Sequence, residues 1–161
     1  MKRGTLLLVV ALALVGLTGR AWAAETDTIT VTVSLTSVVS VSVSPAAWNI
    51  GAISLNGTNG PESFTATNDG NVTEDLTITG ANGANSWNIG ATADLDQFSV
   101  ILDEGDVSED ALETTPVPLT SSLASEAGHA FDLTYHAPSD DNQGGGADHS
   151  FTITITASAS P

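Results

Sequence analysis

Cysteine is absent from this 161-residue sequence, and the last basic residue is Arg20. Without cysteine, no disulfide can cross-link the fold, so a hydrophobic core has to stabilise it. Residues 24–161 contain all nineteen Asp and Glu and neither Lys nor Arg, which gives them a formal side-chain charge of −19. Nucleic acids and anionic lipids are recognised mainly through Lys and Arg, so this composition argues against both as partners.

Catalytic motifs are missing as well. The sequence has no G-x-S-x-G elbow, no thiol nucleophile and, beyond residue 20, no Lys or Arg that could stabilise a developing oxyanion. Carboxylate pairs are plentiful, but they fall in loop-like stretches, whereas glycosidases hold theirs at a fixed separation in a cleft. We therefore expect a protein that is not an enzyme.

Residues 1–23 have the three parts of a secretory signal peptide. Lys2 and Arg3 precede an apolar stretch at residues 6–17, and Ala21-Trp22-Ala23 is an A-x-A cleavage site. A retained membrane anchor is the alternative, but a transmembrane helix needs about 20 apolar residues. The sequence thus predicts cleavage after Ala23 and a secreted or cell-surface location, with the periplasm left open. No membrane insertion is expected once the signal is removed.

Beyond the signal, the chain shows short runs of alternating apolar residues separated by turn residues, and no convincing helical pattern. About eight such runs predict an all-β fold: a single antiparallel Ig-like β-sandwich of seven to eight strands over residues 38–161, with an extended N-terminal strand. We also expect Trp48 and Trp87 to be core residues. The other residues expected in the core are Val31, Val33, Val41, Val43, Ile50, Ile53, Phe64, Leu76, Ile78, Phe98, Val100, Leu119, Phe131, Leu133, Phe151 and Ile153.

One run, "TITVTVSLTSVVSVSVSP" at residues 28–45, is too long for an ordinary strand of about 3–10 residues. Its alternation changes phase at residues 37–39, so we assign residues 39–44 to the chain's own sheet and residues 24–37 to an N-terminal extension strand. The extension presents Ile29, Val31, Val33 and Leu35 and lacks the charges, especially Lys, that usually protect an edge strand. These four residues are the predicted self-association strand, which pairs either within the chain or with a neighbouring copy.

Three stretches are expected to be irregular. "NGTNGP" at residues 56–61 predicts a turn cluster, and "NDGN" at residues 68–71 predicts a hairpin turn, because Asn, Asp and Gly tolerate positive φ. Residues 103–116 are acidic and have no period, so they are expected to form a long exposed loop.

From Val43 onward, the order of short motifs is that of a known kind of module. "SPAAWNIGAI" is followed by "FTATNDGNVTEDLTI", "LASEAGHAFDLTYHAPSD" and "HSFTITITAS". This order resembles the Ig-like sandwich modules of the ASH/Hydin and choice-of-anchor D kind, which implies a scaffold for adhesion, spacing or assembly. A fainter similarity is to secreted fibre subunits of the TasA/camelysin type. The positions that carry the first resemblance are Trp48, Ile50, Gly51, Asn68, Gly70, Gly128 and Pro138.

Acidic clusters are the candidate metal ligands, because Ca²⁺ binds about 6–8 hard oxygen ligands. The better candidate site is Asp103, Glu104, Asp106 and Asp110, in "DEGDVSED". A second acidic group gathers in the Gly-rich loop at residues 138–148. The alternative is that both are solvated loops whose charge keeps the protein soluble. His136 and His149 flank the Gly-rich loop and could face each other across its base.

Two functions fit these observations. The first is a secreted, non-enzymatic structural or surface protein, a self-assembling fibre or matrix subunit whose partner is itself. The alternative is an extracellular carbohydrate- or cell-wall-binding β-sandwich module that uses exposed aromatic residues or calcium and whose partner is a cell-surface polymer. The first rests on the uncharged extension strand, and the second requires Trp48 and Trp87 to be accessible.

Overall fold

The computed structural model describes residues 28–104, 110–142 and 147–161. These residues form strands and no helix, which confirms the predicted all-β class. The strands are β1 (Val41–Ser44), β2 (Thr58–Asn68), β3 (Glu74–Gly80), β4 (Asn88–Ile89), β5 (Gln97–Asp103), β6 (Asp110–Ala111), β7 (Val117–Leu123), β8 (Gly128–His136) and β9 (Ile153–Ala159).

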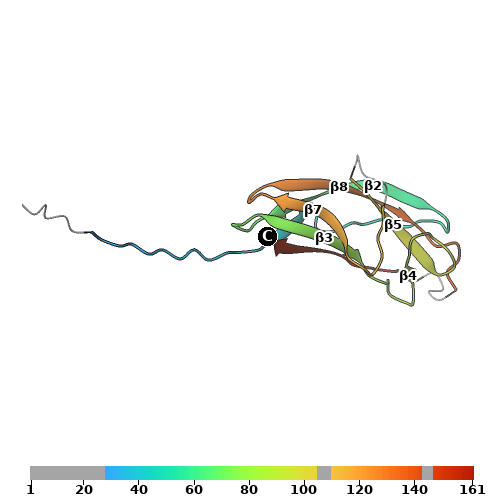
Figure 1. Cartoon of the computed structure of the whole chain (residues 1–161). Coiled ribbons are helices and arrows are strands. Elements are labelled where there is room, and N and C mark those ends of the chain that lie inside the picture. Colours follow the sequence, from blue (N-terminus) through green and yellow to red (C-terminus); the bar gives the residue numbers. More distant parts are fainter. Residues whose placement is uncertain (1–27, 105–109, 143–146) are drawn as a thin grey trace, which may run out of the picture. The chain divides into compact units, whose positions relative to one another are not determined.

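The strands form two sheets that pack face to face as a sandwich (Figure 1). The larger sheet has the order β1-β2-β8-β5-β4, with β6 also paired to β5, and the smaller has the order β7-β3-β9. All pairings are antiparallel except the short contact between β4 and β5, which is parallel. The two-residue strands β4 and β6 bring the total in the described residues to nine, while the other seven match the predicted count.

The chain divides into two compact units, Met1–Leu35 and Thr36–Pro161. All nine strands belong to the second unit. In the first unit, residues 28–35 are described and form no strand. The predicted signal peptide lies outside the described residues.

The core lies between the two sheets, where the inward-facing residues of successive strands meet. In β3, burial alternates with period two, as expected for a strand with one buried face. The predicted core is confirmed at eight buried positions. These are Phe64, Leu76, Ile78, Phe98, Val100, Leu119, Phe131 and Leu133.

The core prediction was wrong for Val31 and Val33, which are 77% and 73% exposed. Alternation shows that a strand has an apolar face but does not show which sheet covers that face. The structure also adds a residue that the pattern missed. Leu112, in the stretch expected to be an exposed loop, is fully buried, because β6 carries it onto β5, where its N–H donates to Val100 O at 2.8 Å.

Residues 68–71 do not form the expected hairpin turn. They connect β2 in the larger sheet to β3 in the smaller one, and none of the four residues has positive φ. The turn is held by Asn68, whose buried amide donates to Val72 O and Leu123 O and accepts from Gly70 N–H at 2.8 Å. Gly70 is required for space, since a Cβ there would meet Val38 O and Glu74 Oε1.

The turn cluster expected at residues 56–61 is also shorter than predicted, because β2 begins at Thr58. Gly60 and Pro61 form a bulge within β2, and the register with β8 shifts between Asn59 and Glu62. β1 pairs with β2 only from Thr65 to Asn68. Pro61 lies outside this paired stretch, so its missing N–H costs no hydrogen bond to β1.

Candidate functional site

The N-terminal segment, residues 29–35, presents one apolar and one polar face. Ile29, Val31, Val33 and Leu35 are 91%, 77%, 73% and 90% exposed, respectively. The residues between them are Thr and Ser, and no charged residue occurs from residue 28 to residue 61. The segment therefore has the side-chain pattern of a half-buried strand without the sheet that would bury it.

β9 is an edge strand, because its only sheet neighbour among the described residues is β3. The ladder between them continues outward to hydrogen bonds from Ala81 N–H to Thr152 O, at 3.0 Å, and from Ser160 N–H to Thr73 O, at 2.9 Å. In an antiparallel ladder, alternate residues point their main-chain groups toward the partner strand. The N–H and C=O groups of Ile153, Ile155 and Ala157 consequently point away from β3, along the free edge.

A groove of about 1020 Å³ lies between this edge and the inner face of the larger sheet. Its far wall is the β1–β2 connection, residues 45–57, which has no strand structure. Most of its lining is apolar. The principal apolar residues are Val43, Trp48, Ile50, Ile53, Phe64, Phe131, Leu133, Tyr135, Phe151, Ile153 and Ile155.

Several groove-lining side chains also belong to the hydrophobic core or pack against it. Trp48 packs edge-on against Phe64, with ring centroids 6.0 Å apart, and Phe64 stacks on Phe131 at 5.7 Å. Tyr135, at the floor, stacks on Phe151 at 5.8 Å. Burial raises the pKa of Tyr135 to about 12, because the phenolate would lose its hydration in these surroundings.

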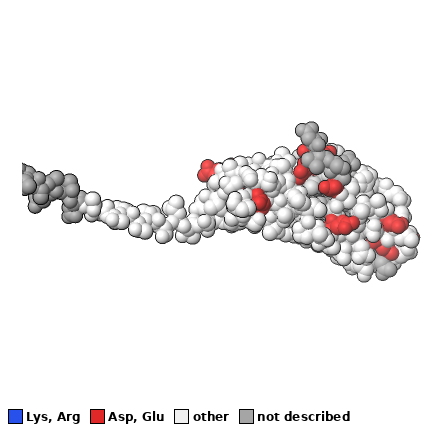
Figure 2. Space-filling view, in the orientation of Figure 1, with Lys and Arg blue, Asp and Glu red and all other residues white. Residues whose placement is uncertain are grey.

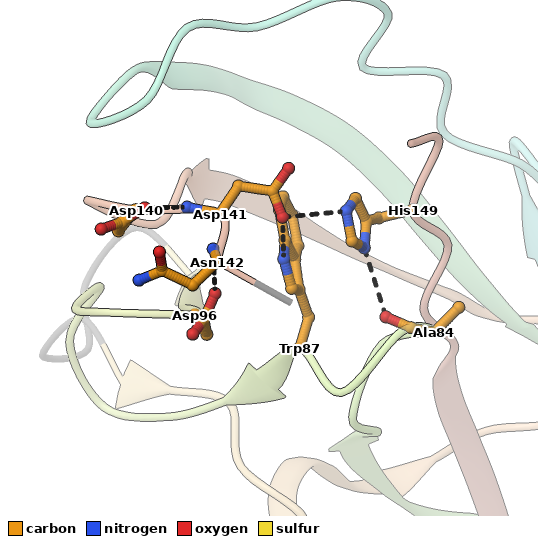
Figure 3. A network of polar contacts seen from close by, with 7 residues as sticks. All are labelled: Ala84, Trp87, Asp96, Asp140, Asp141, Asn142 and His149. Atoms are coloured by element: carbon orange, nitrogen blue, oxygen red, sulfur yellow. Dashed lines mark hydrogen bonds and ion pairs between the residues drawn. The ribbon is translucent and has the colours of Figure 1, made fainter. Parts of the chain in front are cut away.

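A polar network, whose residues are drawn in Figure 3, forms part of the groove lining. Trp87 stacks on His149 with ring centroids 3.6 Å apart, and its indole N–H donates to Asp141 Oδ1 at 3.1 Å. His149 Nδ1 lies 3.2 Å from Ala84 O, and because a carbonyl only accepts, this nitrogen carries a proton. The other ring nitrogen, Nε2, lies 3.5 Å from Asp141 Oδ1 and forms an ion pair when it is protonated.

Two other carboxylates hold the backbone of this loop, Asp140 within the loop and Asp96 directly before β5. Asp140 accepts from the N–H of Asp141 at 2.7 Å, and Asp96 accepts from the N–H of Asn142 at 2.8 Å (Figure 3). His136 contacts Thr58 Oγ1 at 3.0 Å, whereas His149 contacts Asp141, Ala84 and Trp87. The two histidines flanking the loop thus have separate partners.

The predicted calcium ligands are spread along two strands. Asp103 ends β5, Glu104 follows it, Asp110 begins β6, and Asp106 lies outside the described residues. Glu104 Oε1 lies 3.7 Å from His129 Nε2, on the neighbouring strand β8. Within the described part of the chain, no three His, Asp or Glu side chains come together as a metal site. The calcium site stays a prediction.

Acidic residues are scattered over the face shown in Figure 2, which carries no Lys or Arg. The groove departs from this pattern. Among the described residues that line it, the acidic ones are Asp141 and Asp148, and both lie in the loop leading to His149. Most of the groove is therefore free of the negative charge that dominates the rest of the protein.

No family model and no curated protein matches this sequence. Over the described ranges, the structure has no helix that is long and apolar enough to cross a membrane. The site is thus interpreted from its own geometry.

Sequence reasoning found the N-terminal segment but missed the groove. Trp48 and Trp87 were expected in the core; both pack against it, are half-buried and also line the groove. The available signal was Gly51 within the apolar run "WNIGAISL" at residues 48–55. In the structure, the φ of Gly51 is +69°. A residue in that conformation interrupts a strand, so the run forms the wall of the groove and not part of either sheet.

Proposed function

We propose that this protein is a secreted, non-enzymatic structural subunit that assembles with copies of itself by β-strand addition. The observation that carries the proposal is the N-terminal segment, four exposed apolar side chains on one face of an uncharged run. Soluble proteins seldom expose such a row without a partner, and an unprotected strand pairs readily with the sheet of another chain. An Ig-like scaffold module of the ASH/Hydin or choice-of-anchor D kind fits this role.

The charge of the chain supports the same function. Residues 24–161 carry −19, so two copies repel each other over most of their surfaces. Assembly then needs a contact made by an uncharged part of the molecule, and residues 28–61 are the stretch that provides one. At physiological ionic strength the remaining repulsion is screened beyond about 8 Å.

Two double variants of the mature chain, residues 24–161, test the proposal. Val31→Asp with Val33→Asp places two charges on the apolar face, whereas Thr30→Asp with Thr32→Asp places the same charges on the polar face. We expect the unmodified chain and the polar-face variant to form concentration-dependent assemblies in sedimentation velocity and filaments in electron microscopy. The apolar-face variant is expected to stay monomeric. An unmodified chain that is monomeric at every concentration contradicts the proposal.

Carbohydrate binding is a second candidate, and the observation that favours it is the pair of tryptophans in an open groove. Indole faces stack on sugar rings, but one face of Trp87 is covered by His149. A glycan array read out together with tryptophan fluorescence tests this candidate. A sugar that binds and loses affinity in Trp48→Ala would support it, and a flat array would exclude it.

A further inference from the structure

We propose that the groove beside β9 is the acceptor for the N-terminal segment of a second copy of this chain. This inference rests on the proposed function and adds to it the surface on which the donated strand lies. It makes the smaller sheet, which has three strands here, into one of four.

The main chain of β9 supplies the first part of the fit. Ile153 and Ile155, which line the groove, direct their N–H and C=O groups away from β3, and Ala157 does the same farther along this edge. A strand laid along this edge would pair with those groups over the length of β9, which is seven residues. Residues 29–35 are a run of the same length.

The side chains supply the second part. In β9, Ile153, Ile155 and Ala157 face the core, while Thr154, Thr156 and Ser158 face outward. The N-terminal segment has the same two-residue pattern, with its apolar residues alternating with Thr30, Thr32 and Ser34. With the apolar face turned inward, its Thr and Ser extend the outer polar surface of β9, and its apolar residues meet the rings and aliphatic side chains that line the groove.

Charge supplies the third part. Donor and groove are both nearly free of acidic residues in a chain whose mature part carries −19. They can therefore approach without like-charge repulsion. The two groove carboxylates lie in the loop leading to His149, and the groove residues contributed by β9 are uncharged.

The contact joins two different surfaces, which determines the form of the assembly. A donor on one copy and a groove on the next make a heterologous, head-to-tail contact that does not use up the second copy's own donor. Repetition gives an open linear chain, with one free groove at one end and one free donor at the other.

A complementation experiment tests this arrangement. The donor variant, Val31→Asp with Val33→Asp, retains its groove. The acceptor variant, Ala157→Pro, retains its donor but loses an N–H at the free edge of β9, where proline leaves the ladder to β3 intact. Each variant alone is expected to be monomeric, and an equimolar mixture is expected to give a 1:1 dimer and no larger species in sedimentation velocity.

The outcomes separate the two proposals. If Ala157→Pro assembles like the unmodified chain, the groove is not the acceptor, while the proposed function stands. If the unmodified chain does not assemble, both fail. If the unmodified chain is monomeric and its tryptophan fluorescence shifts in the donor variant, the segment fills the groove of its own chain, which also overturns assembly.

A peptide measurement covers the case in which Ala157→Pro does not fold. A synthetic peptide of residues 28–36 is titrated into the donor variant, whose groove is empty of its own segment, and binding is followed by the fluorescence of Trp48 and Trp87, which both line the groove. A peptide of the same composition without the alternation is the control. The native peptide is expected to bind at least about tenfold more tightly than the control, a difference of about 1.4 kcal/mol. Equal affinities would overturn the inference.

Discussion

The indole ring of Trp87 lies flat on the imidazole ring of His149, with centroids 3.6 Å apart and planes inclined by 10°. This stack joins the segment before β4 to the segment before β9, two parts of the chain that are 62 positions apart in sequence. It keeps the indole in place in the lining of the groove.

His149→Ala is expected to lower the free energy of unfolding by about 1.5 kcal/mol, because the stack and the contacts to Asp141 and Ala84 are lost together. Urea unfolding followed by tryptophan fluorescence measures the change. His136→Ala is the matched control, since His136 makes one exposed hydrogen bond, and its effect should stay within about 0.5 kcal/mol. Equal losses in the two variants would contradict a structural role for the stack.

Glu74→Gln is expected to stabilise the sandwich by about 1 kcal/mol, because it removes a charge from a fully buried position. Oε1 of Glu74 accepts from Ser40 N–H at 2.8 Å, a bond that the glutamine oxygen can retain, while Oε2 has no hydrogen-bond partner among the described residues. Glu74→Ala is the comparison, and it should destabilise by about 2 kcal/mol, since it leaves the Ser40 N–H unsatisfied. Chemical unfolding of the three proteins tests the predicted order.

Asp75 makes the stability of the smaller sheet pH-dependent. Hydrogen bonds from Ser160 Oγ and from Ser122 N–H, the latter at 2.8 Å, hold the pKa of this carboxyl below its usual value. A lowered folded-state pKa contributes stability that is present above the unfolded-state value, near 3.8, and is lost as the pH falls through the folded-state value. Ser160→Ala should raise the pKa of Asp75, as measured by NMR titration, and weaken this acid dependence. An unchanged titration would contradict the role of Ser160.

Ionisation of Tyr135 should make the stability of the protein fall at high pH. It is the only tyrosine in the sequence, so tyrosinate absorbance reports this residue alone. Its pKa is raised to about 12 from a usual 10.0, so the stability it contributes is complete below pH 10 and is lost as the pH rises toward 12. The absorbance titration should have its midpoint well above 10. Tyr135→Phe should remove the part of the alkaline destabilisation that falls in this window, and a midpoint at 10 would show that the ring is solvated.

Salt should stabilise residues 24–161, because their nineteen carboxylates repel one another with no Lys or Arg between them. Raising the ionic strength from about 0.01 M to 1 M shortens the Debye length from about 30 Å to 3 Å. We expect the melting temperature to rise by several degrees, since about 1 kcal/mol corresponds to roughly 4 °C in a domain of this size.

Comparing the melting temperature in Ca²⁺ and in Mg²⁺ tests the predicted calcium site. Diffuse screening affects all divalent cations alike, so Ca²⁺ and Mg²⁺ at equal ionic strength should raise the melting temperature equally. A preference for Ca²⁺ that disappears in Asp103→Asn would instead establish a specific site at the predicted ligands.

The fold class followed from the sequence because strand alternation and turn residues are local signals. The runs around Phe64, Ile78 and Phe131 each have an apolar face of period two, and each is a strand in the structure. Local signals were less informative where a contact comes from far along the chain. Leu112 stands among acidic residues and looked exposed, yet β6 places it against β5.

The donor half of the candidate site was visible in the sequence, because its properties are those of seven consecutive residues. Ile29, Val31, Val33 and Leu35 alternate without a charge among them, whatever the rest of the chain does. Trp48 and Trp87 were harder to interpret. A half-buried tryptophan in a groove and a buried one in a core share the same sequence pattern, since both lie beside apolar neighbours.

The groove itself depends on the order of strands in space. "FDLTY" in β8 and "FTITI" leading into β9 alternate in the same way, so local pattern establishes that both are strands with one apolar face. β8 lies between β2 and β5, whereas β9 pairs with β3 alone within the described part of the chain. Strand neighbours are set by pairings between distant segments, which no short pattern encodes, and this is why only the assembled sandwich reveals the open edge beside β9.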